Sequence, residues 1–289
     1  DDVAFVGIGV GAGTPHGAVD VSDTIDLAVA DCEFQACLAG EPGVVRIAEN
    51  ATFEVLDSSF TDCDADQAVV NVIDQASGVI IGSTFASCTP YTIRQRGDLL
   101  TVRDVSLIQA AAPAVAVGLG SRLALTEMTF EQCAAPVLEV GGQATWSRGS
   151  VTAIEGAADQ PVLLLGREST LSCSWLTIDD HPGPLAAAGG AADLTIASSL
   201  VTWLGVPLLR LRDPDGWAAP TLAVDRSDFW SPGVSAWQGL EDVRDAGEGN
   251  LEADPLYCDP DGGDHRLRPA SPCVVDGVAQ CGAFAVGCE

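Results

Sequence analysis

The sequence has 289 residues, 47% hydrophobic and only 6% aromatic, and its 41 acidic residues against 13 basic ones give a formal net charge of −28. A chain of this length can bury a substantial core, and its many small and β-branched residues favour short strands over large packed helices. The acidic excess argues against nucleic acid or an anionic membrane surface as a partner, because both are negatively charged. No uninterrupted apolar run reaches transmembrane length, so membrane insertion is not expected.

The first segment, residues 1–20, is rich in glycine and alternates apolar residues, which disfavours a helix. We interpret it as an irregular first coil. The sharper hypothesis is a strand that adds to the exposed edge or end of another copy of the chain. The self-association residues of that strand would be Val3, Phe5, Val6, Ile8 and Val10.

Residues 21–249 contain a repeat of roughly 25 residues, a period typical of solenoids. A Phe-x-x-Cys pattern marks four copies, and the aligned apolar anchors are Phe34, Phe60, Phe85, Leu107, Phe130, Val151, Leu176, Leu200 and Phe229. An alternating segment such as TFEVLDSSF precedes each anchor, and a second apolar burst such as AVVNVIDQ follows most of them. Alternation in short pieces bounded by Gly, Pro and Asp predicts strands, and each unit is too short to add a covering helix.

The spacing therefore predicts an all-β, right-handed parallel β-helix of about nine or ten coils. Equivalent residues of successive coils would lie about 4.8 Å apart along the axis. The Phe side chains would point inward and stack, with Phe60 directly on Phe85. The cysteines three residues later, at Cys37, Cys63, Cys88 and Cys133, would form a second inward column.

The ten cysteines include no C-x-x-C pair, which leaves zinc and haem sites unsupported and indicates disulfides formed in an oxidising compartment. With a first residue other than Met, this is typical of a processed, exported protein. Residues 250–289 form a Cys-rich C-terminal cap that we expect to fold over the end of the solenoid. The preferred cap disulfides are Cys258–Cys273 and Cys281–Cys288. In the coils, Cys63–Cys88 and Cys37–Cys63 are both feasible; Cys133 and Cys173 are expected as buried thiols.

The repeats DCEFQAC…GVVRI and SSFTDC…AVVNV resemble those of bacterial right-handed parallel β-helix proteins, the pectate-lyase-like superfold. The tail NLEADPLYCDPDGGDHRLRPASPC, followed by a closing GAF, is similar to a terminal segment of secreted bacterial members. The resemblance implies a fold and an extracellular setting. It implies no single chemistry, because this superfold hosts lyases, hydrolases, adhesins, tailspikes and structural proteins.

Three acidic clusters are candidate sites. Catalysis would need paired carboxylates beside a histidine, as in Asp179, Asp180 and His181, although we interpret this stretch as a solvated turn. Calcium is the one cofactor considered, because alternating carboxylates supply hard oxygen ligands. Its preferred loop contains Asp259, Asp261 and Asp264, and a second contains Asp62, Asp64 and Asp66. Acidic turn residues are the simpler interpretation of both loops.

Tryptophans could stack on sugar rings, and Trp175 and Trp230 should face outward because each adjoins an inward anchor. Trp146, Trp203, Trp217 and Trp237 lie in the same half of the chain, but their registers differ. We therefore expect a non-catalytic extracellular scaffold, either structural or adhesive, such as a self-assembling surface, matrix or filament subunit. The alternative is a polysaccharide-binding or polysaccharide-cleaving β-helix protein, a lyase or a glycoside hydrolase.

Overall fold

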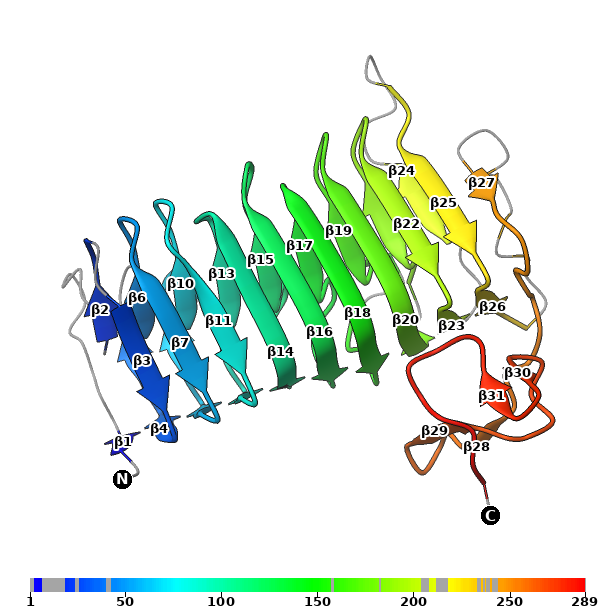
Figure 1. Cartoon of the computed structure of the whole chain (residues 1–289), viewed down its shortest axis with the longest axis horizontal. Helices are drawn as coiled ribbons and strands as arrows, with labels where there is room; N and C mark the ends of the chain where they lie inside the picture. Colours follow the sequence, from blue (N-terminus) through cyan, green and yellow to red (C-terminus); the bar gives the residue numbers. More distant parts are fainter. Residues whose placement is uncertain are drawn as a thin grey trace.

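The computed structural model describes residues 3–6, 19–23, 26–39, 43–156, 159–181, 183–203, 208–211, 218–232, 235, 237, 240 and 244–288. These residues form an all-β parallel solenoid of about eight turns, without a helix among them (Figure 1). The fold class is confirmed, and the number of turns is slightly lower than the nine or ten coils expected.

The larger sheet has 16 strands and forms two adjoining walls of the rod. The first wall comprises β3 (Asp26–Ala30), β7 (Thr52–Leu56), β11 (Ser77–Ile81), β14 (Leu99–Ile108), β16 (Arg122–Glu131), β18 (Gln143–Thr152), β20 (Thr170–His181), β22 (Asp193–Ala197), β25 (Thr221–Asp225) and β27 (Arg244–Ala246). The second wall comprises β1 (Val3–Val6), β4 (Cys32–Gln35), β8 (Ser59–Thr61), β12 (Thr84–Ala86), β23 (Leu200–Trp203) and β26 (Asp228–Trp230), together with the second halves of β14, β16, β18 and β20.

A nine-stranded parallel sheet forms the third wall. It comprises β2 (Val19–Val21), β6 (Val45–Ile47), β10 (Val70–Val72), β13 (Ile93–Gln95), β15 (Val115–Val117), β17 (Leu138–Val140), β19 (Leu163–Leu165), β21 (Ala186–Ala188) and β24 (Leu209–Leu211). The short strands β5 (Leu38–Ala39) and β9 (Asp64–Ala65) pair with each other. The cap contains two antiparallel pairs, β28 (Tyr257–Asp259) with β29 (Asp264–Leu267), and β30 (Val274–Val275) with β31 (Val278–Ala279).

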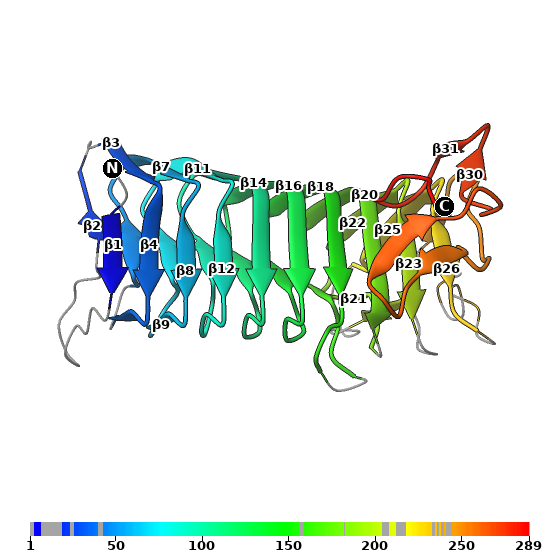
Figure 2. The same ribbon diagram turned by 90° about the horizontal axis from the view of Figure 1, so that it is seen from below.

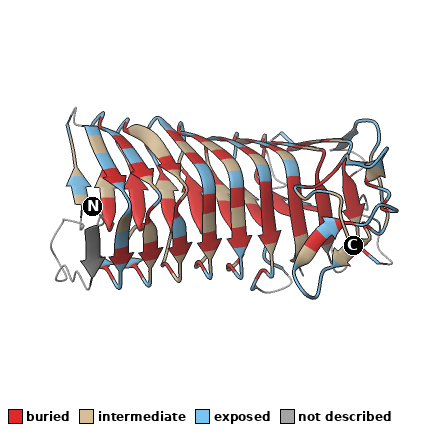
Figure 3. Cartoon of the chain, turned by 60° about the horizontal axis from the view of Figure 1, so that its bottom comes forward, coloured by how far each residue is buried: buried red, intermediate tan, exposed pale blue. Residues whose placement is uncertain are grey.

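The core is a set of side-chain columns inside these walls, where buried and exposed residues alternate along the strands (Figure 3). Phe34 stacks on Phe60 with ring centroids 4.5 Å apart, and Phe60 stacks on Phe85 at 4.6 Å. Leu107 continues the column between Phe85 and Phe130, as the repeat predicts.

The cysteine column explains the second half of the Phe-x-x-Cys pattern. The Cys63 thiol donates to the carbonyl oxygen of Phe34, 3.5 Å away, and the Cys88 thiol donates to that of Phe60 at 3.6 Å. Cys133 donates to Leu107 of the preceding coil at 3.3 Å. Each of these three thiols therefore has an acceptor on the coil before it. Cys63 and Cys88 are free thiols, so neither of the disulfides considered feasible, Cys63–Cys88 and Cys37–Cys63, is formed.

The anchor register differs from the prediction in the last coils. Val151 pairs with Ile178, and Ile178 pairs with Val201, so the inward anchors are not Leu176 and Leu200. Leu176 instead pairs with Gly149 and fills a neighbouring inward position. Leu176 and Ile178 are both apolar and lie two positions apart on the same side of β20. The apolar–polar alternation alone therefore could not decide which of them is the anchor.

Residues in the left-handed backbone region form the corner between the first two walls. Their φ values lie between 46° and 57° at Asp31, Asp57, Asp104, Glu127, Arg148, Trp175, Ser198 and Arg226. Toward the N-terminus, Ser58 and Ser83 follow this corner, and the Ser83 hydroxyl accepts the Ser58 amide hydrogen at 3.2 Å. In the middle coils, Val105 and Met128 occupy this position and the strands run uninterrupted through the corner. Where a serine is present, its hydroxyl accepts an amide hydrogen that would take part in backbone hydrogen bonding between the strands if their pairing were continuous.

The N-terminal strand β1 pairs in parallel with β4 of the same chain, with Val3 opposite Cys32 and Phe5 opposite Phe34. It therefore continues the second wall by one strand. Ile8 and Val10, two of the predicted self-association residues, lie outside the described residues. A role of this strand in pairing with other copies stays a prediction.

The cap lies against the outer face of the second wall at β20, β23 and β26, whereas we expected it over the end of the rod (Figures 1 and 2). All four cap cysteines form disulfides, but the pairs are Cys258–Cys288 and Cys273–Cys281. The predicted pairing, Cys258–Cys273 and Cys281–Cys288, is therefore wrong.

Candidate functional site at the cap–solenoid junction

The junction is built on the outward residues of three neighbouring strands. Thr177 of β20, Leu200 of β23 and Asp228 of β26 pair in register and form one outward column. Their chain neighbours Ile178, Val201 and Phe229 point into the core. The cap buries all three outward residues, so the ends of β20, β23 and β26 are covered on both faces.

A small apolar cluster holds the cap on this column. Leu200 packs with Tyr257 and Leu267 of the cap and with the Cys273–Cys281 disulfide. Two backbone groups of the cap add hydrogen bonds. The Ala283 amide donates to Thr177 Oγ1 at 2.9 Å, and the Gly282 amide donates to the Ser198 carbonyl at 2.9 Å.

The strongest electrostatic contact across the junction joins His265 and Asp179. His265 Nε2 lies 2.8 Å from Asp179 Oδ2, and the exposed fractions of the two side chains are only 8% and 14%. Thr202 donates its hydroxyl hydrogen to the other carboxylate oxygen. Asp179 therefore accepts hydrogen bonds from a neighbouring strand and from a residue 86 positions later in the chain.

Both ring nitrogens of His265 face acceptors. Nδ1 lies 3.2 Å from the carbonyl oxygen of Gly263, and Nε2 faces the Asp179 carboxylate. A neutral imidazole carries one N–H and would leave one of these contacts without a hydrogen. The arrangement therefore calls for the doubly protonated ring. The hydrogen bond with Asp179 raises the pKa of His265, and burial opposes this effect.

Aromatic rings enclose the imidazole. Tyr257 lies edge-on at 5.2 Å between centroids, and Phe284 stacks on the other side at 5.7 Å. The face of the Phe284 ring attracts a cation, so this stacking favours the charged form of His265, whereas an edge-on ring does not. The Tyr257 hydroxyl is buried and has no hydrogen-bond partner among the described residues. Burial, followed by the negative charges of Asp179 and Asp228, raises the Tyr257 pKa well above its usual value.

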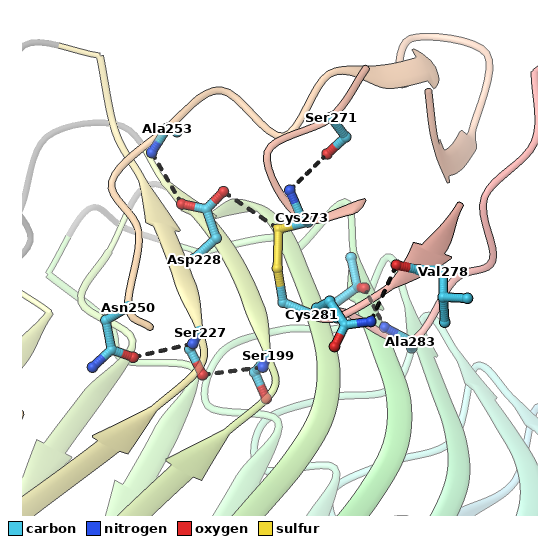
Figure 4. Close-up of a disulfide and its surroundings, with 12 residues drawn as sticks. Ser199, Ser227, Asp228, Asn250, Ala253, Ser271, Cys273, Val278, Cys281 and Ala283 are labelled. Carbon is cyan, nitrogen blue, oxygen red and sulfur yellow. Dashed lines mark hydrogen bonds between the residues drawn. A yellow bond between two sulfur atoms is a disulfide. The ribbon is translucent and has the colours of Figure 1, made fainter. Parts of the chain in front are cut away.

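Asp228 is a second buried acid at the junction (Figure 4). Its Oδ1 accepts the Ala253 amide hydrogen at 3.0 Å, and its Oδ2 lies 3.5 Å from Cys273 Sγ. Because Cys273 is in a disulfide, its sulfur has no hydrogen to donate, and the only hydrogen available for that contact is the acid's own. Burial raises the Asp228 pKa to about 6, and the charges of Asp254 and Glu252 add to the shift.

The candidate catalytic residues Asp179 and His181 contact different groups. Asp179 bonds to His265 of the cap, whereas His181 Nε2 lies 2.9 Å from the carbonyl oxygen of Gln160. The side chain of Asp180 lies outside the described residues. The sequence did not connect His265 with Asp179, because the two residues are distant in the chain. The signals that point to His265 are the GDHRL stretch of the tail and the small number of histidines.

The predicted calcium loops do not gather their carboxylates. Asp264 is held by both arms of the Arg266 guanidinium, at 2.9 and 2.7 Å, and this hydrogen bonding lowers the Asp264 pKa to about 2. Asp259 accepts the Gly262 amide hydrogen, and Asp64 accepts the Thr89 hydroxyl. In the described part of the chain, no three acidic, histidine or cysteine side chains are grouped so as to hold a metal ion.

The tryptophans divide between core and surface. Trp175 faces outward as predicted and is 38% exposed, and Trp230 is half-buried. Trp146 is fully buried, where it fills the space above Gly149, so it is a core residue. Trp237 packs edge-on against Phe229 at 5.0 Å. The side chain of Trp203 and the whole of Trp217 lie outside the described residues.

A column of hydroxyl side chains leads along the second wall to the cap. Successive coils present one Ser or Thr each at the same outward register, and we call Ser59, Thr84, Ser106, Thr129, Ser150 and Thr177 the hydroxyl row. The cap covers Thr177 at its end. The row is uncharged in a strongly acidic protein, and five of its six members directly precede a predicted anchor, although the row was not recognised from the sequence.

No family model, no curated protein and no solved structure matches this chain. The parallel β-solenoid is therefore established by the structure, while bacterial origin, secretion and the pectate-lyase-like assignment have no support from relatives. The two disulfides are consistent with an extracellular location. Among the described residues, no helix has the length and apolar character needed to cross a membrane.

Proposed function

We propose that the chain is a non-catalytic extracellular scaffold, a structural or adhesive rod of the secreted bacterial β-helix type. The observation that carries the proposal is the single apolar core, which runs from Val29 in the first coil to Phe229 in the last. The Asp–His cluster that most resembled an active site is used to bind the cap. The similarity of the repeats and of the tail to secreted β-helix proteins supports the extracellular setting, as do the two disulfides.

Self-assembly through the N-terminal end is part of this proposal. Among the described strands, β1 pairs only with β4 and β3 only with β7, so no described strand pairs with the other edge of either. Unpaired strand edges readily accept another strand. The net charge of −28 opposes close approach of copies, so we expect assembly to require salt or divalent cations that screen the charge.

Electron microscopy and light scattering test this proposal. The full chain and a variant lacking residues 1–13 would be compared at low ionic strength, at high ionic strength and with calcium. We expect rods that join end to end at high ionic strength for the full chain and single rods for the variant. Single rods under every condition, or equal assembly of both proteins, would contradict assembly through this end.

Polysaccharide binding or cleavage is the second candidate, because the hydroxyl row offers evenly spaced donors and acceptors and Trp175 offers an exposed ring. Retention on a panel of insoluble and soluble polysaccharides tests binding, and release of new chain ends tests cleavage. Trp175→Ala should abolish any retention, whereas Leu119→Ala, which removes the most exposed of the large apolar side chains described, should not. Cleavage of any member of the panel would overturn the non-catalytic proposal.

A further inference from the structure

The cap is bound to the solenoid through two contacts that each need a proton. The first is the ring of His265, which faces an acceptor at each nitrogen. The second is the Asp228 carboxyl, which faces a sulfur atom without a hydrogen. We propose that the cap is a proton-dependent latch, which docks on β20, β23 and β26 with His265 and Asp228 both protonated and is released as those protons leave.

The His265 contact fails without its second proton. Loss of the proton from Nε2 leaves a lone pair facing the Asp179 carboxylate at 2.8 Å, and loss from Nδ1 leaves one facing the Gly263 carbonyl oxygen. Both contacts are repulsive, and the one with Asp179 is nearly buried, so water can do little to relieve it, whereas Gly263 is exposed. Thr202 cannot compensate, because its single hydroxyl hydrogen is already donated to Asp179.

The Asp228 contact is also weakened by the loss of its proton. An ionised carboxylate would place its Oδ2 against the Cys273–Cys281 sulfur, while backbone hydrogen bonds from Ala253 and Phe229 offset only part of the cost of burial. A buried carboxylate without a charged partner is disfavoured. Release of the cap returns Asp228 to water, where ionisation is easy.

The charged groups around the two sites reinforce the effect. His265 faces Asp179 on β20 and Tyr257 on β28, with Asp264 on its own strand. Asp228 is influenced by Glu252 and Asp254 in the segment that leads into the cap. The Cys273–Cys281 disulfide carries no charge. Once His265 is neutral, its attraction to the Asp179 carboxylate is lost, so the docked state is weakened.

Both groups weaken docking as the pH rises, and they do so over adjoining pH ranges. Both pKa values are higher in the docked state, so both stabilise docking at low pH and lose that contribution as the pH rises. For Asp228 the loss extends from its ordinary value of 3.8 up to about 6. For His265 it begins at 6.5 and ends at its raised pKa. Each unit by which the pKa of a group differs between the docked and released states changes the docking equilibrium about tenfold.

Release of the cap would change the surface of the rod. The cap covers Thr177, Leu200 and Thr202, and Thr177 is the last member of the hydroxyl row. An open cap extends this row and adds one apolar residue beside it. A mildly acidic medium therefore keeps this part of the face covered, and a neutral or alkaline medium uncovers it.

The reduction of the two cap disulfides by a phosphine tests the latch. Cys273 and Cys281 are buried by docking, whereas Cys258 and Cys288 remain partly exposed and provide an internal control. Each rate would be measured by mass spectrometry between pH 5 and 9. We expect the rate for Cys273–Cys281, divided by that for Cys258–Cys288, to rise at least about tenfold across this range. A constant ratio would overturn the proposal.

Two variants and a matched control test whether Asp228 and His265 carry the protons on which docking depends. Asp228→Asn supplies a permanent N–H toward the sulfur and keeps an acceptor for Ala253, so the Cys273–Cys281 disulfide should stay protected below pH 6.5. His265→Gln has no ionisable group and should abolish the change above pH 6.5. Asp261→Asn removes an exposed acid in the turn of the same hairpin and should leave the profile unchanged. If both junction variants retained the parent profile, these two groups would not be the latch.

Hydrogen exchange keeps the proposal testable if a variant does not fold. Peptides covering residues 264–288 of the unaltered protein would be compared with peptides of β14 and β16, with intrinsic exchange rates corrected for pH. Protection of the cap should fall as the pH rises while protection of the coils stays constant. Parallel behaviour of the two regions would contradict release of the cap.

Discussion

Phe60 lies flat on Phe85, with ring centroids 4.6 Å apart and planes inclined by 7°, although 25 positions separate them in the chain. This spacing equals the separation of neighbouring strands in a sheet, so the ring stack follows the backbone ladder. Phe60 also contacts Phe34 on its other side at 4.5 Å. It is therefore the central ring of a three-ring stack and the most informative core position to alter.

We expect Phe60→Ala to reduce the free energy of unfolding by about 3–5 kcal/mol, because it opens a cavity between two rigid rings. Phe60→Leu should cost less, since Leu107 occupies the same column two coils later. Denaturant unfolding followed by circular dichroism measures both, with Leu119→Ala as a surface control. A Phe60→Ala protein as stable as that control would show that the stack contributes little.

The buried thiols should resist labelling in the folded protein. Burial raises the Cys133 pKa to about 11 and the Cys173 pKa to about 12, so neither forms a reactive thiolate at neutral pH. Partly exposed Cys32 should react first with a maleimide. In denaturant the six cysteines outside the cap disulfides should react, as counted by mass. A Cys63–Cys88 disulfide would leave only four and would contradict the structure.

Gly149 gives a test of core packing. A Cβ there would lie 2.3 Å from Trp146 Nε1 and 2.8 Å from the Met128 carbonyl oxygen, so Gly149→Ala should cost about 1–3 kcal/mol. In a Trp146→Leu background the cost should be smaller, because only the backbone clash remains. A double-mutant cycle measured by urea unfolding gives the coupling energy. Additive effects within about 0.5 kcal/mol would show that the indole does not occupy the space above Gly149.

The cap disulfides should stabilise the cap more than the coils. Replacing Cys258 and Cys288 together by serine opens a loop of 30 residues, for which chain entropy predicts a loss of about 3–4 kcal/mol. Peptide mapping under non-reducing conditions first establishes the pairs, and hydrogen exchange then follows the cap and the coils separately. Recovery of Cys258 joined to Cys273 would contradict the structure.

The core columns were predictable because inward positions recur at a fixed place in every coil. The Phe-x-x-Cys copies placed Phe34, Phe60 and Phe85 correctly, with Leu107 as a substitute. The repeat pattern indicated the wrong anchor in β20, where Leu176 and Ile178 are both apolar and lie on the same side of the strand. The sequence assigned no side to Trp146, because an aromatic residue suits a core as well as a surface.

The junction was less predictable, because it depends on contacts between distant segments. Asp179 was recognised as a notable acid, but nothing local connects it with His265. Four cysteines can pair in three ways, and the spacing favoured the short loop 258–273 over the observed connection of Cys258 with Cys288. The position of the cap on the side of the rod, which decides both features, is a property of the folded chain alone.

Because the Cys63 and Cys88 thiols each donate to a carbonyl oxygen of the coil before them, these two neighbouring coils have the same kind of partner on the preceding coil. A duplicated stretch that began at Cys63 and ended before Cys88 would find a carbonyl oxygen at one side and a thiol at the other. Such a duplication would lengthen the molecule by about 4.8 Å without new core chemistry. The reach of this protein can therefore evolve in uniform increments while its two ends stay unaltered.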